Sequence, residues 1–223
     1  MNYEKRRSWA EISLENLTDN YHLLTKLAAP AKVIAVLKAN AYGHGAVPVS
    51  KALEKVGCAH FAVATPEEAV ELRESGSSAQ ILVLGAADDP AYVRIAAQMD
   101  ITLPVFDAYH AKMLASRAGG IPLKVQWKVD TGLGRYGYTL RDDTIEAAVE
   151  QAKQIAATHS LILTGVWTHI ACANAPQEDE YTAHQLALFD RLVQGVRAAG
   201  LHVAFHCANS PVTLRFPAAH YDF

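Results

Sequence analysis

The sequence predicts an α/β fold built on a parallel sheet, because short apolar runs alternate with amphipathic segments along the chain. Apolar runs of four to eight residues bounded by turn signals are typical of buried parallel strands. The expected strands are Val33–Lys38, Phe61–Thr65, Ile81–Gly85, Ile101–Val105, Leu123–Asp130, Leu163–Ile170 and Val203–Ala208. A doubly wound sheet can have this number of strands, whereas an α/β barrel has one more.

Helices are expected between the strands and before the first of them. Ser13 can cap the first helix, and Pro66 lies near the start of the second. The helix expected at Glu178–Ala199 is the longest and carries apolar residues at helical spacing. The expected helices are Ser13–Leu27, Thr65–Ser75, Asp89–Gln98 and Glu178–Ala199, with another starting near Asp142.

Composition narrows the class of protein. The chain has 223 residues, 51% of them hydrophobic, which suits one globular domain with a sizeable core. A net charge of −3 gives no strong attraction to nucleic acid or to a membrane, and the short basic group Lys5–Arg7 is expected to be solvated. No apolar run approaches the roughly 20 residues that cross a bilayer, and the first residues lack a signal-peptide core.

The three cysteines, Cys58, Cys172 and Cys207, lie in apolar surroundings without metal-ligand spacing. An odd number of cysteines and no export signal favour reduced thiols in the cytoplasm. The histidines also lack a ligand spacing, since His202 and His206 are four residues apart on a strand and therefore too distant to share a metal. No metal site is expected.

The segment Val33–Gly45 carries the clearest chemical signal. Apolar residues lead to Lys38 at the carboxyl end of the first strand, where α/β folds place their chemistry. Apolar neighbours would desolvate the Lys38 amine and leave a nucleophile that condenses with aldehydes. A solvated surface lysine is the alternative, but the phenol of Tyr42 and the flexible Gly43 and Gly45 suit a phosphorylated aldehyde cofactor.

Alternation within the strands predicts which side chains line the interior. In Leu123–Asp130, the even-numbered residues Lys124, Gln126, Lys128 and Asp130 share the polar face, which should point inward. Trp167 and His169 share a face of the next strand. We therefore expect a cluster of ionisable groups at one end of the fold, made of Lys38, Lys128, Asp130, His169 and His206.

Gly132–Gly137 matches the G-x-G-x-x-G fingerprint of dinucleotide-binding folds. That fingerprint requires a helix to open within the glycine turn. Here Tyr138–Arg141 intervene before the next expected helix, and the motif does not follow the first strand. We interpret these glycines as a loop that presents Arg135, not as a nicotinamide cofactor site.

Five segments resemble the alanine racemases. Val36–Gly45, read as VLKANAYGHG, is similar to their pyridoxal-phosphate attachment signature over ten consecutive positions. The likeness continues in the same order in Lys128–Arg135, Trp167–His169, His206–Ser210 and Thr213–Pro217. The resemblance implies a (β/α)8 TIM-type barrel followed by a mainly β C-terminal domain. Residues 1–223 are then expected to form the N-terminal barrel domain, ending before its last strand.

The resemblance also implies an activity. Lys38 would hold pyridoxal 5'-phosphate as a Schiff base and act as one of two acid/base groups that interconvert L- and D-alanine, supplying D-alanine for peptidoglycan. In the family the second group is a tyrosine from the C-terminal domain of the partner subunit in a homodimer. That tyrosine and an arginine at the pyridine nitrogen fall outside these residues, so the chain alone is expected to be weakly active or inactive.

The family's roles transfer to individual residues by motif. Arg135 would be catalytic, near the cofactor's phenolic oxygen and the substrate carboxylate. Lys128 would be carbamylated and hold Arg135. Tyr42 and Ser210 would bind the cofactor phosphate, with Asn209 in the same turn. Leu84 and His169 would pack on the cofactor ring, and His206 would lie behind it.

Three alternatives stay open. A racemase that prefers serine differs by one substrate hydroxyl, which an apolar pocket rejects only modestly. A non-catalytic pyridoxal-phosphate carrier has the same barrel as a single domain of about this length. A decarboxylase of basic amino acids shares the barrel and a similar lysine, with different glycine segments.

Overall fold

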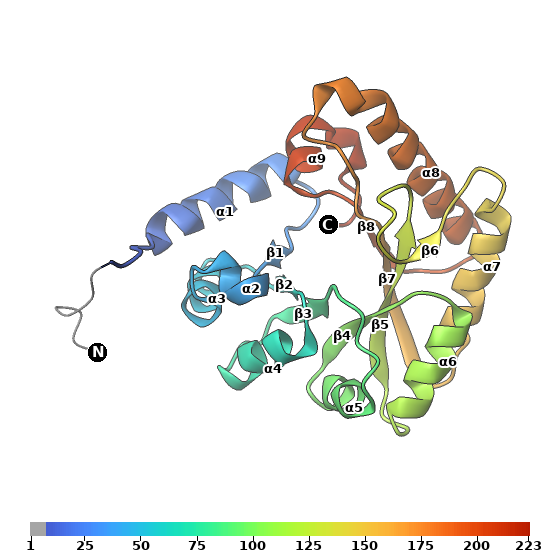
Figure 1. Ribbon diagram of the computed structural model, residues 1–223, viewed down its shortest axis with the longest axis horizontal. Coiled ribbons are helices and arrows are strands. Elements are labelled where there is room, and N and C mark those ends of the chain that lie inside the picture. Colours follow the sequence, from blue (N-terminus) through green and yellow to red (C-terminus); the bar gives the residue numbers. More distant parts are fainter. Residues whose placement is uncertain (1–7) are drawn as a thin grey trace.

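The computed structural model describes residues 8–223, which form one curled parallel sheet with helices on its outer side (Figure 1). The basic group Lys5–Arg7 lies outside the described residues. The strands are β1 (Ala35–Val36), β2 (His60–Val63), β3 (Gln80–Val83), β4 (Ile101–Val105), β5 (Leu123–Asp130), β6 (Tyr138–Thr139), β7 (Leu161–Trp167) and β8 (Ala204–His206).

The α-helices cover the sheet in chain order. They are α1 (Leu14–Ala28), α2 (Lys38–Tyr42), α3 (Ala46–Lys55), α4 (Pro66–Glu74), α5 (Pro90–Gln98), α6 (Ala108–Arg117), α7 (Ile145–Ala156), α8 (Asp179–Ala198) and α9 (Ser210–Arg215). Short 3-10 turns lie at Pro176–Glu178 and Pro217–Ala219.

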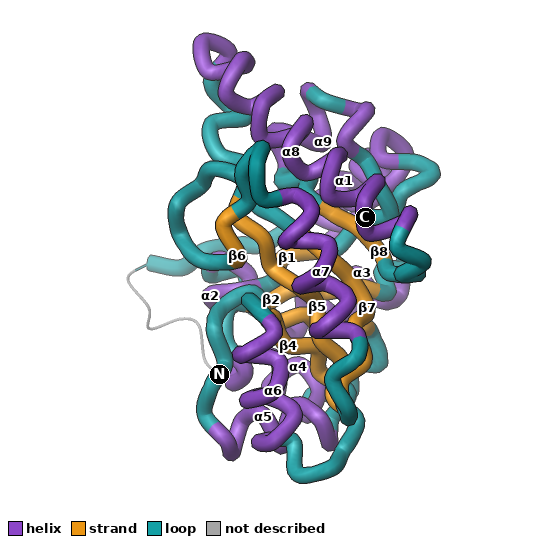
Figure 2. The backbone as a smooth tube through the Cα atoms, turned by 90° about the vertical axis from the view of Figure 1, so that its right-hand side faces the viewer, coloured by secondary structure: helices purple, strands orange, loops and turns teal. Residues whose placement is uncertain are grey.

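The strand order is β1-β2-β3-β4-β5-β7-β8, and every pairing is parallel. Helices α3 to α8 each contact the next and follow one another around the outside of the curve, while the strands run through the middle of the molecule (Figures 1 and 2). A doubly wound sheet would carry helices on both faces. The arrangement is therefore that of a TIM-type barrel, with β1 and β8 at the two edges of the sheet.

Most sequence-based element predictions are confirmed. The bounds of β4 and β5 agree with the prediction, and Ser13 caps α1 by accepting a hydrogen bond from the Asn16 N–H at 3.2 Å. Helix α7 begins at Ile145 instead of near Asp142, because Arg141 and Thr144 bond to each other in a turn. The two-residue β6, which pairs with the end of β5, was not predicted.

The predicted faces of β5 are also confirmed. Val125, Trp127 and Val129 are fully buried in the apolar core, and the Trp127 indole N–H donates to the Phe106 carbonyl at 2.9 Å. Gln126 and Lys128 point to the other side, toward His206 and Trp167. The sheet thus has an apolar outer face and a polar inner face at β5.

Two local predictions are wrong. Val33–Lys38 was expected to be a buried strand, but only Ala35–Val36 form β1, and Val36 is 39% exposed because β1 is an edge strand. Cys172 was expected in apolar surroundings, yet it is exposed in the loop after β7. Cys58 and Cys207 are buried, and all three thiols are free.

Among residues 8–223, no helix combines the length and the apolar character that crossing a bilayer requires.

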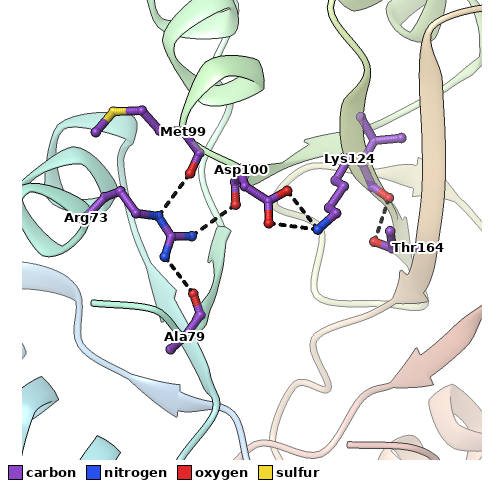
Figure 3. Close-up of polar contacts among 7 residues, drawn as sticks. Arg73, Ala79, Met99, Asp100, Lys124 and Thr164 are labelled. Carbon is purple, nitrogen blue, oxygen red and sulfur yellow. Dashed lines mark hydrogen bonds and ion pairs between the residues drawn. The ribbon is translucent and has the colours of Figure 1, made fainter. Parts of the chain in front are cut away.

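Arg73 ties together chain segments at the end of the sheet where the strands begin (Figure 3). Its guanidinium donates to the carbonyls of Met99 at 2.9 Å, Asp100 at 3.0 Å, Ser77 at 2.7 Å and Ala79 at 2.9 Å. The Asp100 side chain in turn pairs with Lys124 at 2.7 Å. A planar fork with five donors suits several carbonyls at once. Arg73 therefore connects helix α4 to the starts of β3 and β4.

Replacing Arg73 with alanine leaves these carbonyls without their charged donor. We expect Arg73→Ala to lower the free energy of unfolding by about 2–4 kcal/mol, measured by denaturant titration. Lys153→Ala removes the same charge from an exposed pair with Glu150 and should cost ~0.5 kcal/mol or less. Equal effects of the two substitutions would contradict this account.

Candidate active site

A cavity of about 750 Å³ opens at the carboxyl ends of the strands, within the range of small-molecule sites. All eight residues that were predicted to contact a cofactor or substrate line this cavity. They are Lys38, Tyr42, Leu84, Arg135, His169, His206, Asn209 and Ser210. The structure therefore brings together residues from segments that lie far apart in the sequence, as parallel strands allow.

Lys38 is the first residue of α2 and comes directly after the ladder of β1, whose last bond joins the Leu37 N–H to the Ala62 carbonyl at 2.8 Å. Its side chain is half-buried, so the predicted sequestration among apolar side chains is wrong. The reason is again the edge position of β1. The Lys38 ammonium nitrogen lies 5.8 Å from the centre of the exposed Tyr42 ring, and the two side chains share the cavity.

The backbone after Lys38 is left-handed. Ala39, Asn40, Ala41 and Tyr42 have φ between 52° and 55°, and Gly43 and Gly45 follow with φ of 86° and 92°. The sequence analysis expected backbone freedom at the two glycines and not at the four residues before them. A left-handed turn of L-residues is costly, so other contacts must stabilise it.

Lys128 is the lysine that burial affects most. It has no exposed surface, its ammonium donates to the Val129 carbonyl at 2.6 Å, and the nitrogen lies 4.9 Å from the Trp167 ring centre and 5.8 Å from that of Tyr136. Burial lowers the pKa of Lys128 to about 8; Asp130 opposes this shift and the charge of Arg135 adds to it. A substantial fraction of neutral amine is therefore present near pH 8.

Asp130 shapes the glycine loop. Its two carboxylate oxygens accept hydrogen bonds from the Gly132 N–H at 2.9 Å and the Arg135 N–H at 3.0 Å. Burial alone would raise the pKa of Asp130, but these backbone donors and the charge of Lys128 outweigh it and lower the pKa. Gly132 has φ of 144° and a Cβ there would lie 2.5 Å from the Tyr181 hydroxyl, so the position requires glycine.

The loop presents Arg135 at the cavity, as predicted. The Arg135 guanidinium lies 5.1 Å from the Tyr136 ring centre and is exposed. Within residues 8–223, no carboxylate forms an ion pair with it. The loop leads into β6 and not into a helix, so it lacks the helix N-terminus that a dinucleotide site uses.

Both histidines of the cavity have lowered pKa values. Burial, followed by the charges of Arg135, Lys128 and Lys38, lowers the pKa of His169 to about 4. Burial and Lys128 lower the pKa of His206 to about 3. His206 stacks on Trp167 at 5.7 Å between ring centres, and its Nε2–H donates to Gln126 Oε1 at 2.8 Å. Both rings are neutral at pH 7, so the positive charge of the site resides on lysine and arginine.

Asn209 and Ser210 form the turn after β8. Asn209 Oδ1 accepts from the Val212 N–H at 3.1 Å, and its Nδ2 donates to the Ile170 carbonyl at 2.9 Å. The Asn209 side chain thus caps α9 and joins two strand ends. Ser210 is exposed at the cavity. A role in cofactor binding stays a prediction for both residues.

The sequence reasoning missed two residues near Lys38 and Lys128. The Tyr136 hydroxyl donates to the Leu84 carbonyl, which fixes the ring beside Lys128. Glu68 accepts a hydrogen bond from the N–H of Ala39, the residue after Lys38. Thr65 and Glu68 have the spacing of a helix capping box, which signals the position of Glu68 but not this partner.

Among the described residues, no group of three or more histidine, cysteine or acidic side chains could hold a metal ion.

Comparison with known proteins gives one consistent result. The family profile described as "Alanine racemase, N-terminal domain" matches residues 12–223. The alanine racemase of Carboxydothermus hydrogenoformans is 35% identical over 97% of this chain and 58% of the relative, and that of Geobacillus stearothermophilus is 38% identical over 97% and 54%. The chain thus spans little more than half the length of these relatives.

Solved structures agree. The alanine racemase of Clostridium difficile has a TM-score of 0.90 at 29% identity, over 98% of this chain and 57% of that one. A histidine racemase from Leuconostoc mesenteroides has a TM-score of 0.84 at 31% identity, over 97% and 56%.

The low pKa of His206 links stability to pH. An unfolded histidine titrates near 6.5, so between pH 6.5 and about 3 the unfolded chain binds the extra proton and stability falls with decreasing pH. This loss is absent above pH 6.5. We expect His206→Gln to remove part of this loss. The decrease in the free energy of unfolding between pH 7 and 4.5 should then be about 1–2 kcal/mol smaller than in the parent. Parallel stability curves for the parent and the variant would contradict a His206 that stays neutral in the folded chain.

Proposed function

Because the chain belongs to the alanine racemase N-terminal domain family, we propose that it forms the cofactor-binding barrel of a pyridoxal-phosphate-dependent enzyme that interconverts L- and D-alanine. The observation that carries this proposal is the convergence of Lys38 and Arg135 on one cavity whose histidines are neutral, with Lys128 buried behind its Tyr136 and Trp167 wall. The excess of positive charge suits a ligand with a phosphate and a carboxylate.

The residues present fit pyridoxal phosphate. The cavity offers the Lys38 amine, beside Tyr42, for the aldehyde, and hydroxyls on Tyr42 and Ser210 for the phosphate oxygens; a second lysine, Lys32, also lines it. Leu84 and the neutral His169 provide a flat, weakly polar surface for a ring. When bound, this cofactor supplies an electron sink that stabilises negative charge at the substrate's α-carbon.

The side chains of this cavity have separate roles in the proposed reaction. Lys38 would hold the cofactor, and its amine would exchange a proton with the substrate's α-carbon. Arg135 binds planar oxygens of the substrate carboxylate through its fork, and Asp130 holds the Arg135 backbone in place. Tyr136 and Trp167 form part of the cavity wall and separate it from the buried Lys128.

The finer parts of the proposal concern the complete protein. The family resemblance supports residues 1–223 as an N-terminal barrel domain in a cytoplasmic homodimer that supplies D-alanine for peptidoglycan. Small amino acids are the proposed substrates, with alanine first and serine as the alternative. A solved relative is titled a histidine racemase, so this barrel accommodates more than one substrate class among its relatives. Initial rates of the complete protein on both alanine enantiomers, serine and histidine would decide among them.

Attachment at Lys38 can be tested on the 223-residue chain. We expect pyridoxal phosphate followed by borohydride to label the peptide that contains Lys38, because this amine lies at the cavity wall 5.8 Å from the Tyr42 ring centre. Lys38→Ala should reduce labelling at least tenfold, whereas Lys51→Ala, at an exposed lysine of α3, should leave it unchanged. A label confined to another lysine would exclude the proposed role of Lys38.

We also propose that Lys128 is carbamylated. The neutral Lys128 amine attacks the carbon of CO₂, a C–N bond forms, and one N–H proton leaves to solvent. The product is an anion in place of a buried cation, next to the positive Arg135. The pKa of about 8 makes the reacting neutral amine available.

Carbon-13 bicarbonate should therefore produce a carbamate NMR signal in the parent chain at pH 8. Lys128→Met should remove that signal, and Lys124→Met, on the same strand but at its opposite end, should keep it. Because the carbamate is labile, peptide mass is a poor probe. A structure from crystals grown with bicarbonate that shows a bare amine at Lys128 would refute the modification.

A further inference from the structure

The turn that carries Lys38 away from β1 is strained and needs contacts from outside itself. Its four left-handed residues are Ala39–Tyr42. Asparagine and glycine tolerate this conformation best, but only one of the four, Asn40, is of either type. Each left-handed residue costs roughly 1–2 kcal/mol relative to a right-handed turn. The conformation of this segment fixes the direction in which Lys38 leaves the backbone.

Hydrogen bonds close this turn from its carboxyl side. The Ala41 N–H donates to the Leu37 carbonyl at 2.7 Å, and the Gly43 N–H donates to the Ala39 carbonyl at 3.0 Å. Asn40 Oδ1 accepts from the Ala46 N–H at 2.7 Å, which joins the turn to α3. These bonds leave the Ala39 N–H, directly after Lys38, to a partner from another element.

That partner is the Glu68 carboxylate. Glu68 Oε1 accepts from the Ala39 N–H at 2.6 Å, and Oε2 accepts from the Ala64 N–H at 2.7 Å. One carboxylate thus connects the residue after Lys38 to the residue that follows β2. Such charge-assisted bonds are short and about twice as strong as neutral ones.

Glu68 itself is held rigidly. It lies in the first turn of α4, where Thr65 caps the helix through its hydroxyl and Pro66 begins it. Its own N–H donates to Thr65 Oγ1 at 3.4 Å. A half-buried carboxylate at a helix N-terminus is favoured by the helix dipole and cannot move far from Ala39.

We propose that Glu68 is a positioning residue that sets the direction of the Lys38 side chain by holding the Ala39 N–H, an assignment that rests on the proposed role of Lys38 as the attachment lysine. Glu68 does not line the cavity. It acts through the backbone, and both of its carboxylate oxygens are needed. The nearly isosteric Glu68→Gln retains one acceptor and places an N–H₂ group against a backbone donor, so it breaks one of the two bonds with little change in shape.

The first measurement needs no cofactor. Amide hydrogen exchange should show the Ala39 N–H protected in the parent, and exchange should accelerate about tenfold or more in Glu68→Gln. Glu67→Gln removes the same charge from an exposed neighbour in the same helical turn and should leave Ala39 unchanged. An Ala39 N–H that exchanges in the parent as fast as a solvent-exposed amide overturns the proposal without any variant.

The second measurement uses pyridoxal phosphate itself. The rate at which the visible absorbance of lysine-bound cofactor appears, with borohydride mapping to Lys38, should fall about tenfold in Glu68→Gln and stay at the parent value in Glu67→Gln. Glu68→Asp keeps both oxygens on a shorter stem and should recover part of the rate. Unfolding curves should show each variant folded at the temperature of the assay.

The outcomes separate the two proposals. If the parent chain is not labelled at Lys38, the proposed function fails. If the parent is labelled at Lys38 and Glu68→Gln is labelled equally fast, the positioning role of Glu68 fails while the attachment role of Lys38 stands. Equal losses in Glu68→Gln and Glu67→Gln would show a general effect of helix charge and would also overturn the positioning role.

Discussion

The concentration of positive charge at one edge of the sheet is the constraint on which the site depends. Parallel strands bring their carboxyl ends together, so Arg135 of the loop after β5 and Lys38 beyond β1 line one cavity, and Lys128 of β5 lies behind its Tyr136 and Trp167 wall. Asp130 offsets part of this charge and stays ionised because three backbone N–H groups and Lys128 stabilise it. Burial, reinforced by the neighbouring positive charge, lowers the pKa of both cavity histidines and keeps them neutral. What remains is a net positive cavity, which suits ligands that carry a phosphate or a carboxylate.

The barrel architecture explains how a buried lysine is tolerated. The outer face of β5 supplies apolar packing, while its inner face carries Gln126 and Lys128 within a polar interior. Gln126 bonds His206, and Trp167 lies between His206 and Lys128. An aromatic face near an ammonium offsets part of its desolvation, and the remaining cost appears as the lowered pKa of Lys128.

The sequence predicts regular elements better than the connections that complete the site. Strands β4 and β5 are central and apolar, so periodicity and length suffice to locate them. Strand β1 lies at an edge with one neighbour. The prediction from its apolar run therefore made the strand too long and too buried. The site residues themselves follow from motifs. The left-handed turn does not, since Ala39, Ala41 and Tyr42 have no local preference for positive φ. The contact of Glu68 with Ala39 could not be predicted from the local sequence, because the two residues are 29 positions apart.

These observations locate the control of Lys38 outside its own segment. Four left-handed residues cost several kcal/mol together, and each ordinary backbone hydrogen bond returns only about 1 kcal/mol. The internal bonds of the turn offset much of that cost, and the contacts with α3 through Asn40 and with α4 through Glu68 stabilise it further. Both helices are fixed by packing on the sheet. The direction of a reactive amine is therefore decided by the assembled β2-α4 unit, which explains why the fold and not the local sequence determines the geometry of the site.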